Sequence, residues 1–341
     1  MDILLTSIVI FILVFIVVSN AKIVDKPQFI SSDMNQVLRG VSCIIVIIVH
    51  IPSKYGNPLQ NLVGSFAYIG VTIFFFLSAY GCRYNIENKK NYLKSFWKKR
   101  LISLFFPVII LNLLNFIFSF LILQNFDMEK IFDINKYIWA IIVAYFIMWC
   151  VWSIDWISRK YKDVLVSVIV FSFSLVTYFT DFDIFFLWPM ESLGFVLGIW
   201  GYRFKDIIAS LLSNYKIKII FLSFTTSILC GVLYLKEKNL FFWGGYLIRF
   251  ILAISILVLI FAILNNFTFT RHRSLVYLGE ISYNVYLGHL IVIDAIVEIF
   301  PNMSSGIFVC LVVLLSILLA ILCRIVIRVL EGFLNKLCVL V

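Results

Sequence analysis

The sequence predicts an all-α fold, a polytopic bundle of transmembrane helices. Of its 341 residues, 63% are hydrophobic and only 13% are charged, and the mean hydropathy is +1.06. A soluble domain of this length cannot bury such a fraction of apolar side chains. Apolar runs of membrane-spanning length also recur along the whole chain, with only short loops between them. Residues 1–341 are therefore predicted to form a single integral membrane domain.

About eleven spans are predicted, each from an apolar run that could cross a bilayer. The runs are 3–18, 37–51, 61–82, 101–123, 137–157, 164–180, 184–201, 217–235, 240–264, 275–300 and 307–329. The first run follows Asp2, where a signal peptide would have positive residues, so we interpret it as an extra, retained N-terminal helix. The other ten spans, over 37–329, would form the core.

The distribution of Lys and Arg predicts the orientation in the membrane. With the basic loop 83–100 in the cytoplasm and alternating spans, 22 of the 28 Lys and Arg lie inside, 5 lie outside and Arg249 lies within a span. The N-terminus is then predicted outside and the C-terminus in the cytoplasm. Because the basic residues occupy short loops, the net charge of +10 indicates contact with membrane lipids and not with nucleic acid.

The cysteines and the short motifs exclude several kinds of site. None of the seven cysteines forms a CxxC pair, and all lie in or beside apolar segments. Neither a disulfide framework nor a metal site is therefore predicted. The sequence also contains no GxxxxGK[ST] loop, no HExxH and no GxSxG.

Segment 36–51, QVLRGVSCIIVIIVHI, carries two ionisable side chains on one face of a predicted helix. Arg39 and His50 are eleven positions apart, so they project within about 20° of each other and are separated by about 16 Å along the axis. Ionisable groups at membrane depth are costly and usually functional, which makes both residues candidates for a catalytic role. The alternative is an arginine that reaches lipid phosphates and a histidine that caps the helix.

The predicted span 275–300 is polar on two opposite sides and should run through the middle of the bundle. One side carries Ser282, Tyr286 and His289; the other carries Glu280, Asn284, Asp294 and Glu298. His289 falls in the outer half, at a depth that His50 could share. Two histidines in a partly dry cavity would suit general-base chemistry. The alternative for His289 is a hydrogen-bonded core residue.

Two further groups of charged residues are candidates for binding or structure. Glu191 and Arg249 lie at comparable depths, so they could form a structural ion pair or contact a substrate. Near the cytoplasm, Lys98, Lys99 and Arg100 lie beside two other predicted cations, Arg39 and Arg83. This cluster could attract a phosphate-bearing cofactor, although positive-inside charge explains it equally well.

Four sequence blocks together resemble the acyltransferase-3 family of polytopic membrane acyltransferases. They are Arg39-Gly40 with His50 after nine residues, GVTIFFFLSAYG at 70–81, KKRLISLFFP at 98–107 and YLGEISYNVYLGH at 277–289. Any one block is common in membrane proteins, but four in the family's order and spacing are specific. Three features depart from the pattern: Ala79 replaces a glycine, the acidic residue before Arg-Gly is displaced to Asp33, and an extra span comes first.

The resemblance implies an O-acyltransferase of the bacterial cytoplasmic membrane. Such enzymes move an acyl group, usually acetyl, from cytoplasmic acyl-CoA to a hydroxyl of a surface polysaccharide or glycolipid outside the cell. By position, Arg39 and His50 match the essential pair of the first motif, and Arg100 matches the basic loop motif. Ser282, Tyr283 and His289 match the late block.

The sequence leaves several alternatives open. His50 could act as a general base or could carry the acyl group transiently as a nucleophile. A transporter or flippase of glycans or lipid-linked sugars is an alternative function, because Glu191 and Arg249 would then mark a translocation path. The chain shows no repeated halves or paired broken helices of the kind that secondary transporters contain. A glycan polymerase is a third candidate.

Overall fold

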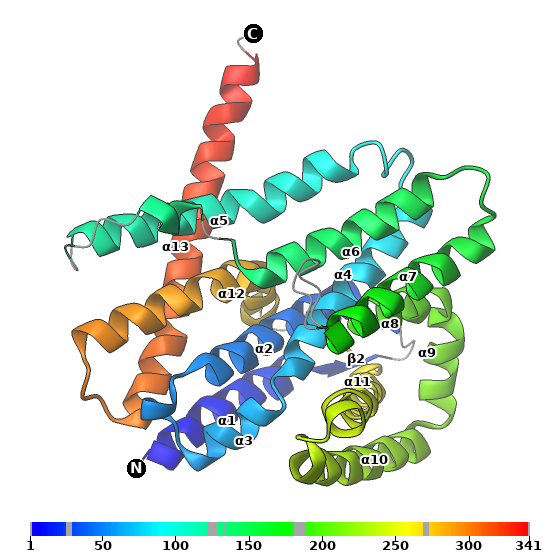
Figure 1. Cartoon of the computed structure of the whole chain (residues 1–341), viewed down its shortest axis with the longest axis horizontal. Coiled ribbons are helices and arrows are strands. Elements are labelled where there is room, and N and C mark those ends of the chain that lie inside the picture. The colour runs from blue at the N-terminus through cyan, green and yellow to red at the C-terminus, as the bar shows by residue number, and fades with distance from the viewer. Residues whose placement is uncertain are drawn as a thin grey trace.

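The computed structural model describes residues 2–24, 29–121, 124, 128–132, 134–180, 189–268 and 273–339, without the side chains of 2, 129, 130 and 331–339. Most of these residues are helical (Figure 1). Among them, ten helical stretches are long and apolar enough to cross a membrane. The predicted all-α polytopic bundle is therefore confirmed. We call the end of the bundle that carries the loop 89–95 the inner end, following the orientation predicted from charge.

The first eight helices cover residues 2–203. They are α1 (Asp2–Asn20), α2 (Ser32–His50), α3 (Pro58–Ser65), α4 (Tyr68–Asn88), α5 (Phe96–Leu121), α6 (Lys136–Ser153), α7 (Arg159–Thr180) and α8 (Leu193–Arg203). The remaining helices are α9 (Lys205–Asn214), α10 (Lys216–Glu237), α11 (Arg249–Leu264), α12 (Arg273–Ile299) and α13 (Ser305–Val339). A π-helical turn, Trp243–Ile248, leads into α11. Two short strands, β1 (Lys22–Ile23) and β2 (Phe267–Thr268), pair antiparallel.

The predicted span 184–201 differs most from the structure. In its place lies α8, which has 11 residues and is therefore only about 16 Å long. Residues 181–188, where this span was predicted to begin, lie outside the described residues. The other ten predicted spans each correspond to one of the ten helical stretches, and α3 and α4 together form one of them, Pro58–Asn88.

Helices α2, α4 and α12 form the centre of the bundle (Figure 1). α4 lies against α8 along two glycines, where a Cβ added at Gly194 or Gly198 would overlap the carbonyl oxygens of Thr72 and Phe76. Small residues spaced four apart allow such backbone contact between membrane helices, where packing must replace the hydrophobic effect. This close contact fixes the position of the short α8 relative to α4.

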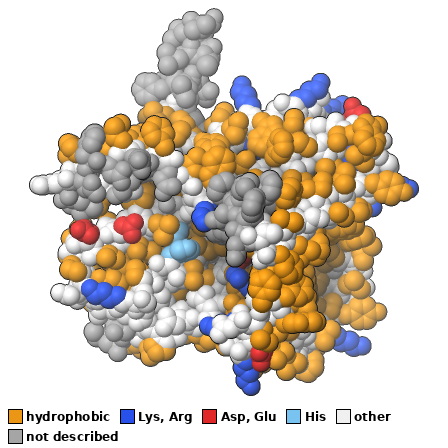
Figure 2. All heavy atoms as spheres, in the orientation of Figure 1, with side chains coloured by type: hydrophobic (Ala, Val, Ile, Leu, Met, Phe, Trp, Pro, Cys, Tyr) orange, Lys and Arg blue, Asp and Glu red, His pale blue; other side chains and the backbone are white. Residues whose placement is uncertain are grey.

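Peripheral helices carry the surface that would face lipid. In the most apolar 18-residue segment of α1, only 11% of the residues are buried, and the fraction is also 11% in α10. Large apolar side chains such as Phe11, Phe15 and Phe221 are more than half exposed there. In the face shown in Figure 2, hydrophobic side chains cover much of the surface, and several Lys and Arg lie at its margins.

One buried amide ties three outer segments together. Asn57 caps α3, and its Nδ2 donates to Thr6 Oγ1 at 2.8 Å and to Ser305 Oγ at 2.9 Å. It therefore links α3 to α1 and to the start of α13. Gln60 completes the capping box by returning a side-chain oxygen to the Asn57 amide.

Candidate active site

Helices α2 and α12 cross at a pair of glycines. A Cβ added at Gly279 would overlap the carbonyl oxygen of Gln36, and one added at Gly40 would lie 3.1 Å from the Gly279 nitrogen. The glycine that follows Arg39 in the first motif therefore has a packing role. Ten residues further along each helix lie His50 and His289, so the two helices run in the same direction in matched register.

The two histidine rings meet at the outer end of this helix pair. Their centroids are 4.9 Å apart, with the ring planes inclined by 65°. His50 is exposed, whereas His289 is 1% exposed and also contacts the Tyr286 ring, with centroids 5.6 Å apart. The sequence placed both histidines at a common depth, and the structure brings their rings together.

Backbone hydrogen bonds define the tautomer of both imidazoles in their neutral form. Nδ1 of His50 lies 2.8 Å from the Val46 carbonyl oxygen, and Nδ1 of His289 lies 2.5 Å from the Tyr286 carbonyl oxygen. A carbonyl can only accept, so Nδ1 carries the proton in each ring. Nε2 therefore keeps its lone pair, and Nε2 of His289 has no hydrogen-bond partner among the described residues. Both rings can act as bases through Nε2.

His50 lines an open cavity of about 450 Å³, which we call the outer cavity. Arg249 and Glu191 line the same cavity and form an ion pair, so the two charges that the sequence placed at comparable depths do meet. Two tyrosines also line it: the Arg249 guanidinium lies 4.3 Å from the ring centroid of Tyr68, and the rings of Tyr68 and Tyr234 are 5.8 Å apart.

A second polar cluster lies inward of the histidines. The Arg100 guanidinium lies 4.7 Å from the Tyr145 ring and 3.1 Å from the sulfur of Cys82. Arg39 donates from Nε to Asn35 Oδ1 at 2.8 Å and lies within electrostatic range of Arg100 and Tyr145. Two of the predicted cations therefore share one interior layer.

A series of contacts connects this inner layer to the histidines. Tyr145 interacts with Ser78, and Ser78 interacts with Tyr137. The Tyr137 ring lies 5.0 Å from the ring of Tyr286, which contacts His289. Contacts between polar and aromatic side chains thus connect Arg100 with the histidine pair.

The other predicted cations lie elsewhere. Lys98 and Lys99 are exposed on the first turn of α5, and Arg83 faces a separate cleft at the inner end. The five cations therefore do not meet at one point. The polar residues of the late block have structural partners: Ser282 Oγ donates to Gly279 O at 2.7 Å, and Tyr283 Oη donates to Leu104 O at 2.9 Å.

Tyr286 has a structural partner too, since its hydroxyl donates to Asn135 Oδ1 at 3.2 Å. On the opposite side of α12, Glu280 forms an ion pair with Arg324 of α13 at 2.5 Å. The predicted acidic side of this span is therefore partly neutralised by a neighbouring helix. Among the described residues, no group of three or more His, Cys, Asp or Glu is placed to hold a metal ion.

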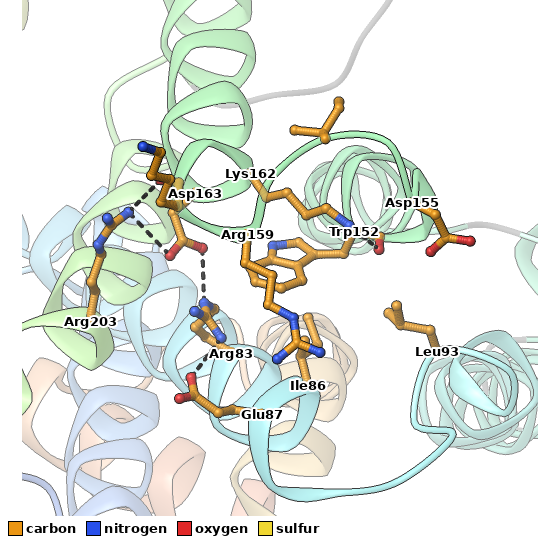
Figure 3. A pocket seen from close by; sticks show the side chains of 12 residues that line it. Arg83, Ile86, Glu87, Leu93, Trp152, Asp155, Arg159, Lys162, Asp163 and Arg203 are labelled. Atoms are coloured by element: carbon orange, nitrogen blue, oxygen red, sulfur yellow. Dashed lines mark hydrogen bonds and ion pairs between the residues drawn. The ribbon is translucent and has the colours of Figure 1, made fainter.

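The cleft at the inner end, which we call the inner cleft, has a volume of about 610 Å³ (Figure 3). Asp163 lines this cleft, and its buried carboxylate accepts a hydrogen bond from Arg83 Nε at 2.9 Å and lies 3.6 Å from Arg203. Trp152 and Arg159 also line it. Apart from Arg83, the sequence analysis singled out none of these residues, because charges at the ends of spans are common and the pairing joins three helices.

Comparison with known proteins gives one match. A family model described as an acyltransferase domain matches residues 36–325, which covers most of α2, all of α3 to α12 and most of α13. The matched segment contains both histidines, the outer cavity and the inner cleft. No curated protein and no solved structure matches the chain.

Proposed function

We propose that this chain, which belongs to the acyltransferase-3 family and is therefore a membrane acyltransferase, uses acyl-CoA, most simply acetyl-CoA, as its donor. The acceptor in this proposal is a hydroxyl of a polysaccharide or glycolipid on the opposite side of the membrane. The observation that carries the proposal is the position of His50. Its ring lines the open outer cavity and contacts His289, from which polar contacts lead inward to Arg100.

The chemistry assigned to His50 is that of a general base. Its Nε2 takes the proton from the acceptor hydroxyl as the hydroxyl oxygen attacks the thioester carbonyl. The new C–O bond forms, the C–S bond breaks, and the proton passes to the departing thiolate of coenzyme A. His289 packs against the His50 ring and acts as a positioning residue. Arg39, which lies within electrostatic range of Arg100, would stabilise negative charge that develops on the thioester oxygen.

The dimensions of the bundle agree with a donor that stays on the inner side. Helix α8, about 16 Å long, connects the turn that places Glu191 on the outer cavity to Arg203 on the inner cleft. An extended pantetheine arm is of similar length, roughly 15–20 Å from standard bond geometry. The thioester could therefore reach His50 while the nucleotide end of the coenzyme remains at the inner end.

The outer cavity has the features of a carbohydrate site. Tyr68 and Tyr234 offer aromatic faces on which a sugar ring could pack, and Ser65 adds a hydroxyl. Glu191 and Arg249 neutralise each other, so the cavity offers hydrogen bonds without a large net charge. These features favour an uncharged, hydroxyl-rich acceptor.

A protein with this chemistry would lie in a bacterial cytoplasmic membrane, with its N-terminus outside. Its partners would be membrane lipids and an envelope glycan.

The decisive experiment measures acyl transfer in proteoliposomes. Purified protein receives labelled acetyl-CoA on the inner side and an envelope glycan on the outer side, and thiol release and glycan acetylation are followed. His50→Gln should reduce both by at least about 100-fold, the usual range for loss of a general base. Val49→Ala, on the same cavity, is the matched control and should retain most activity. Full activity of the folded His50→Gln variant, or glycan movement without thiol release, would contradict the proposal.

A further inference from the structure

The walls of the inner cleft carry several charged side chains that already have partners within the protein. Asp163 is held by Arg83 and Arg203, and Glu87 lies 3.0 Å from the other side of Arg83. The ammonium of Lys162 donates to the Trp152 carbonyl at 3.0 Å. Figure 3 shows these groups along the walls of the cleft. They define its shape, and because three cations face two carboxylates they leave a small positive charge.

Two other cations on the same cleft remain available. Arg159 makes no ion pair or hydrogen bond through its side chain with any residue that the structure describes, and Figure 3 shows it pointing into the hollow. Lys160 lines the cleft, and its ammonium lies 4.8 Å from the centroid of the Tyr161 ring and forms no ion pair among the described residues. Asp155 is the one lining carboxylate without an ion pair among the described residues, so the free charge is positive.

An unpartnered donor inside the cleft indicates what these cations bind. Trp152 is 7% exposed, and its Nε1 has no hydrogen-bond partner among the described residues. A buried donor without an acceptor is unfavourable, and a ligand with acceptor oxygens would remove that cost. Arg159 is also the first residue of α7, whose N-terminus adds free amide groups and a partial positive charge. Every free group except Asp155 thus favours an anion rich in oxygen.

The apolar part of the lining adds a second requirement. Ile86, Leu93 and Ile157 line the cleft, and Trp152 adds its indole, whose ring centroid lies 4.3 Å from the Arg83 guanidinium. A planar base would pack against such a surface while its phosphates reach Arg159 and Lys160. The volume of about 610 Å³ is within the range of small-molecule and cofactor sites.

From these contacts we propose that the inner cleft binds the phosphoadenosine end of acyl-CoA, with Arg159, Lys160 and Trp152 as its phosphate-binding groups. This assignment rests on the proposed donor. It places the nucleotide on the α6–α7 junction, away from the exposed Lys98 and Lys99 of the basic loop. Arg83 lines the cleft and follows Cys82 on α4, and Cys82 contacts Arg100, from which the series of contacts to the histidines begins.

Binding is tested without any acyl transfer. Adenosine 3′,5′-bisphosphate is titrated calorimetrically into the full-length protein in nanodiscs made of a neutral lipid. Wild-type protein should bind it, and Arg159→Gln/Lys160→Gln should weaken binding at least tenfold. The matched control is Lys89→Gln/Lys90→Gln, which removes two exposed cations at the same end outside the cleft and should bind as the wild type does. Equal affinities for all three proteins would overturn the assignment.

Steady-state kinetics distinguish failure of this assignment from failure of the proposed function. With acetyl-CoA the Arg159→Gln/Lys160→Gln protein should show a KM raised at least tenfold and a nearly unchanged kcat. With S-acetylpantetheine, which lacks the phosphoadenosine group, wild type and variant should have the same kcat/KM. If the variant transfers acyl groups normally and its KM for acetyl-CoA is unchanged, the cleft does not bind the nucleotide, although the proposed acyltransferase function still holds. Loss of wild-type nucleotide binding in anionic phospholipid nanodiscs would show that the cleft holds lipid headgroups, which would also overturn the assignment.

Discussion

The ion pair between Arg249 and Glu191 permits a quantitative test of how this bundle stabilises charge. The side chain of Glu191 is 10% exposed and that of Arg249 is 28% exposed. Removal of one partner from a fully buried pair costs about 3–5 kcal/mol, because the remaining charge is left unpaired. The outer cavity admits solvent to the arginine, so we expect Arg249→Met to cost about 2–3 kcal/mol of the free energy of unfolding.

The double variant Glu191→Gln/Arg249→Met identifies the source of this cost. Without either charge no unpaired carboxylate remains, so most of the lost stability should return, to within about 1 kcal/mol of the wild type. Thermal unfolding of the detergent-solubilised protein measures all four members of the cycle. Polar contacts between membrane helices average only about 0.6 kcal/mol. A single variant that loses no more than this, or a double variant as unstable as the two single effects combined, would refute the buried-charge explanation.

Three further changes test the fold. Gly279→Ala should destabilise the protein by at least about 1–3 kcal/mol, because the added methyl group meets a carbonyl of α2; an unchanged melting temperature would contradict the close helix crossing. Asn57→Ala removes a helix cap and two inter-helix hydrogen bonds, and we expect it to cost about 2–3 kcal/mol; proteolysis of residues 51–58 at the wild-type rate would argue against this. Cysteines introduced at Lys54 and Lys89 should react with a membrane-impermeant maleimide from the outside and from the inside, respectively; labelling of both from one side would overturn the orientation.

Much of the site could be predicted from the sequence because charged and polar residues are scarce in the spans. Glu191 and Arg249 were predicted to form an ion pair or to contact a substrate, since an isolated charge at membrane depth is costly. His50 and His289 were predicted to reach depths that they could share, because helical geometry gives each a definite depth. The family motifs correctly identified the acyltransferase family, which the match over 36–325 confirms.

The features that could not be predicted depend on contacts between helices. Asp163 lies near the end of a span, where charged residues are ordinary, and only the packing of α4, α7 and α8 joins it to Arg83 and Arg203. The segment 184–201 is apolar enough to resemble a span, but hydropathy measures composition and does not reveal that α8 has only 11 residues. Lys98 and Lys99 adjoin Arg100 in sequence, yet helical rotation leaves them on the surface.

The crossing of α2 and α12 makes the spacing of the two imidazoles sensitive to chain length. Gly40 precedes His50 by the same number of residues as Gly279 precedes His289. A single residue inserted into one of these intervals would turn that ring by about 100° and advance it by about 1.5 Å. Insertions and deletions between glycine and histidine should therefore be tolerated far less than in the peripheral helices α1 and α10, even where every inserted residue is apolar.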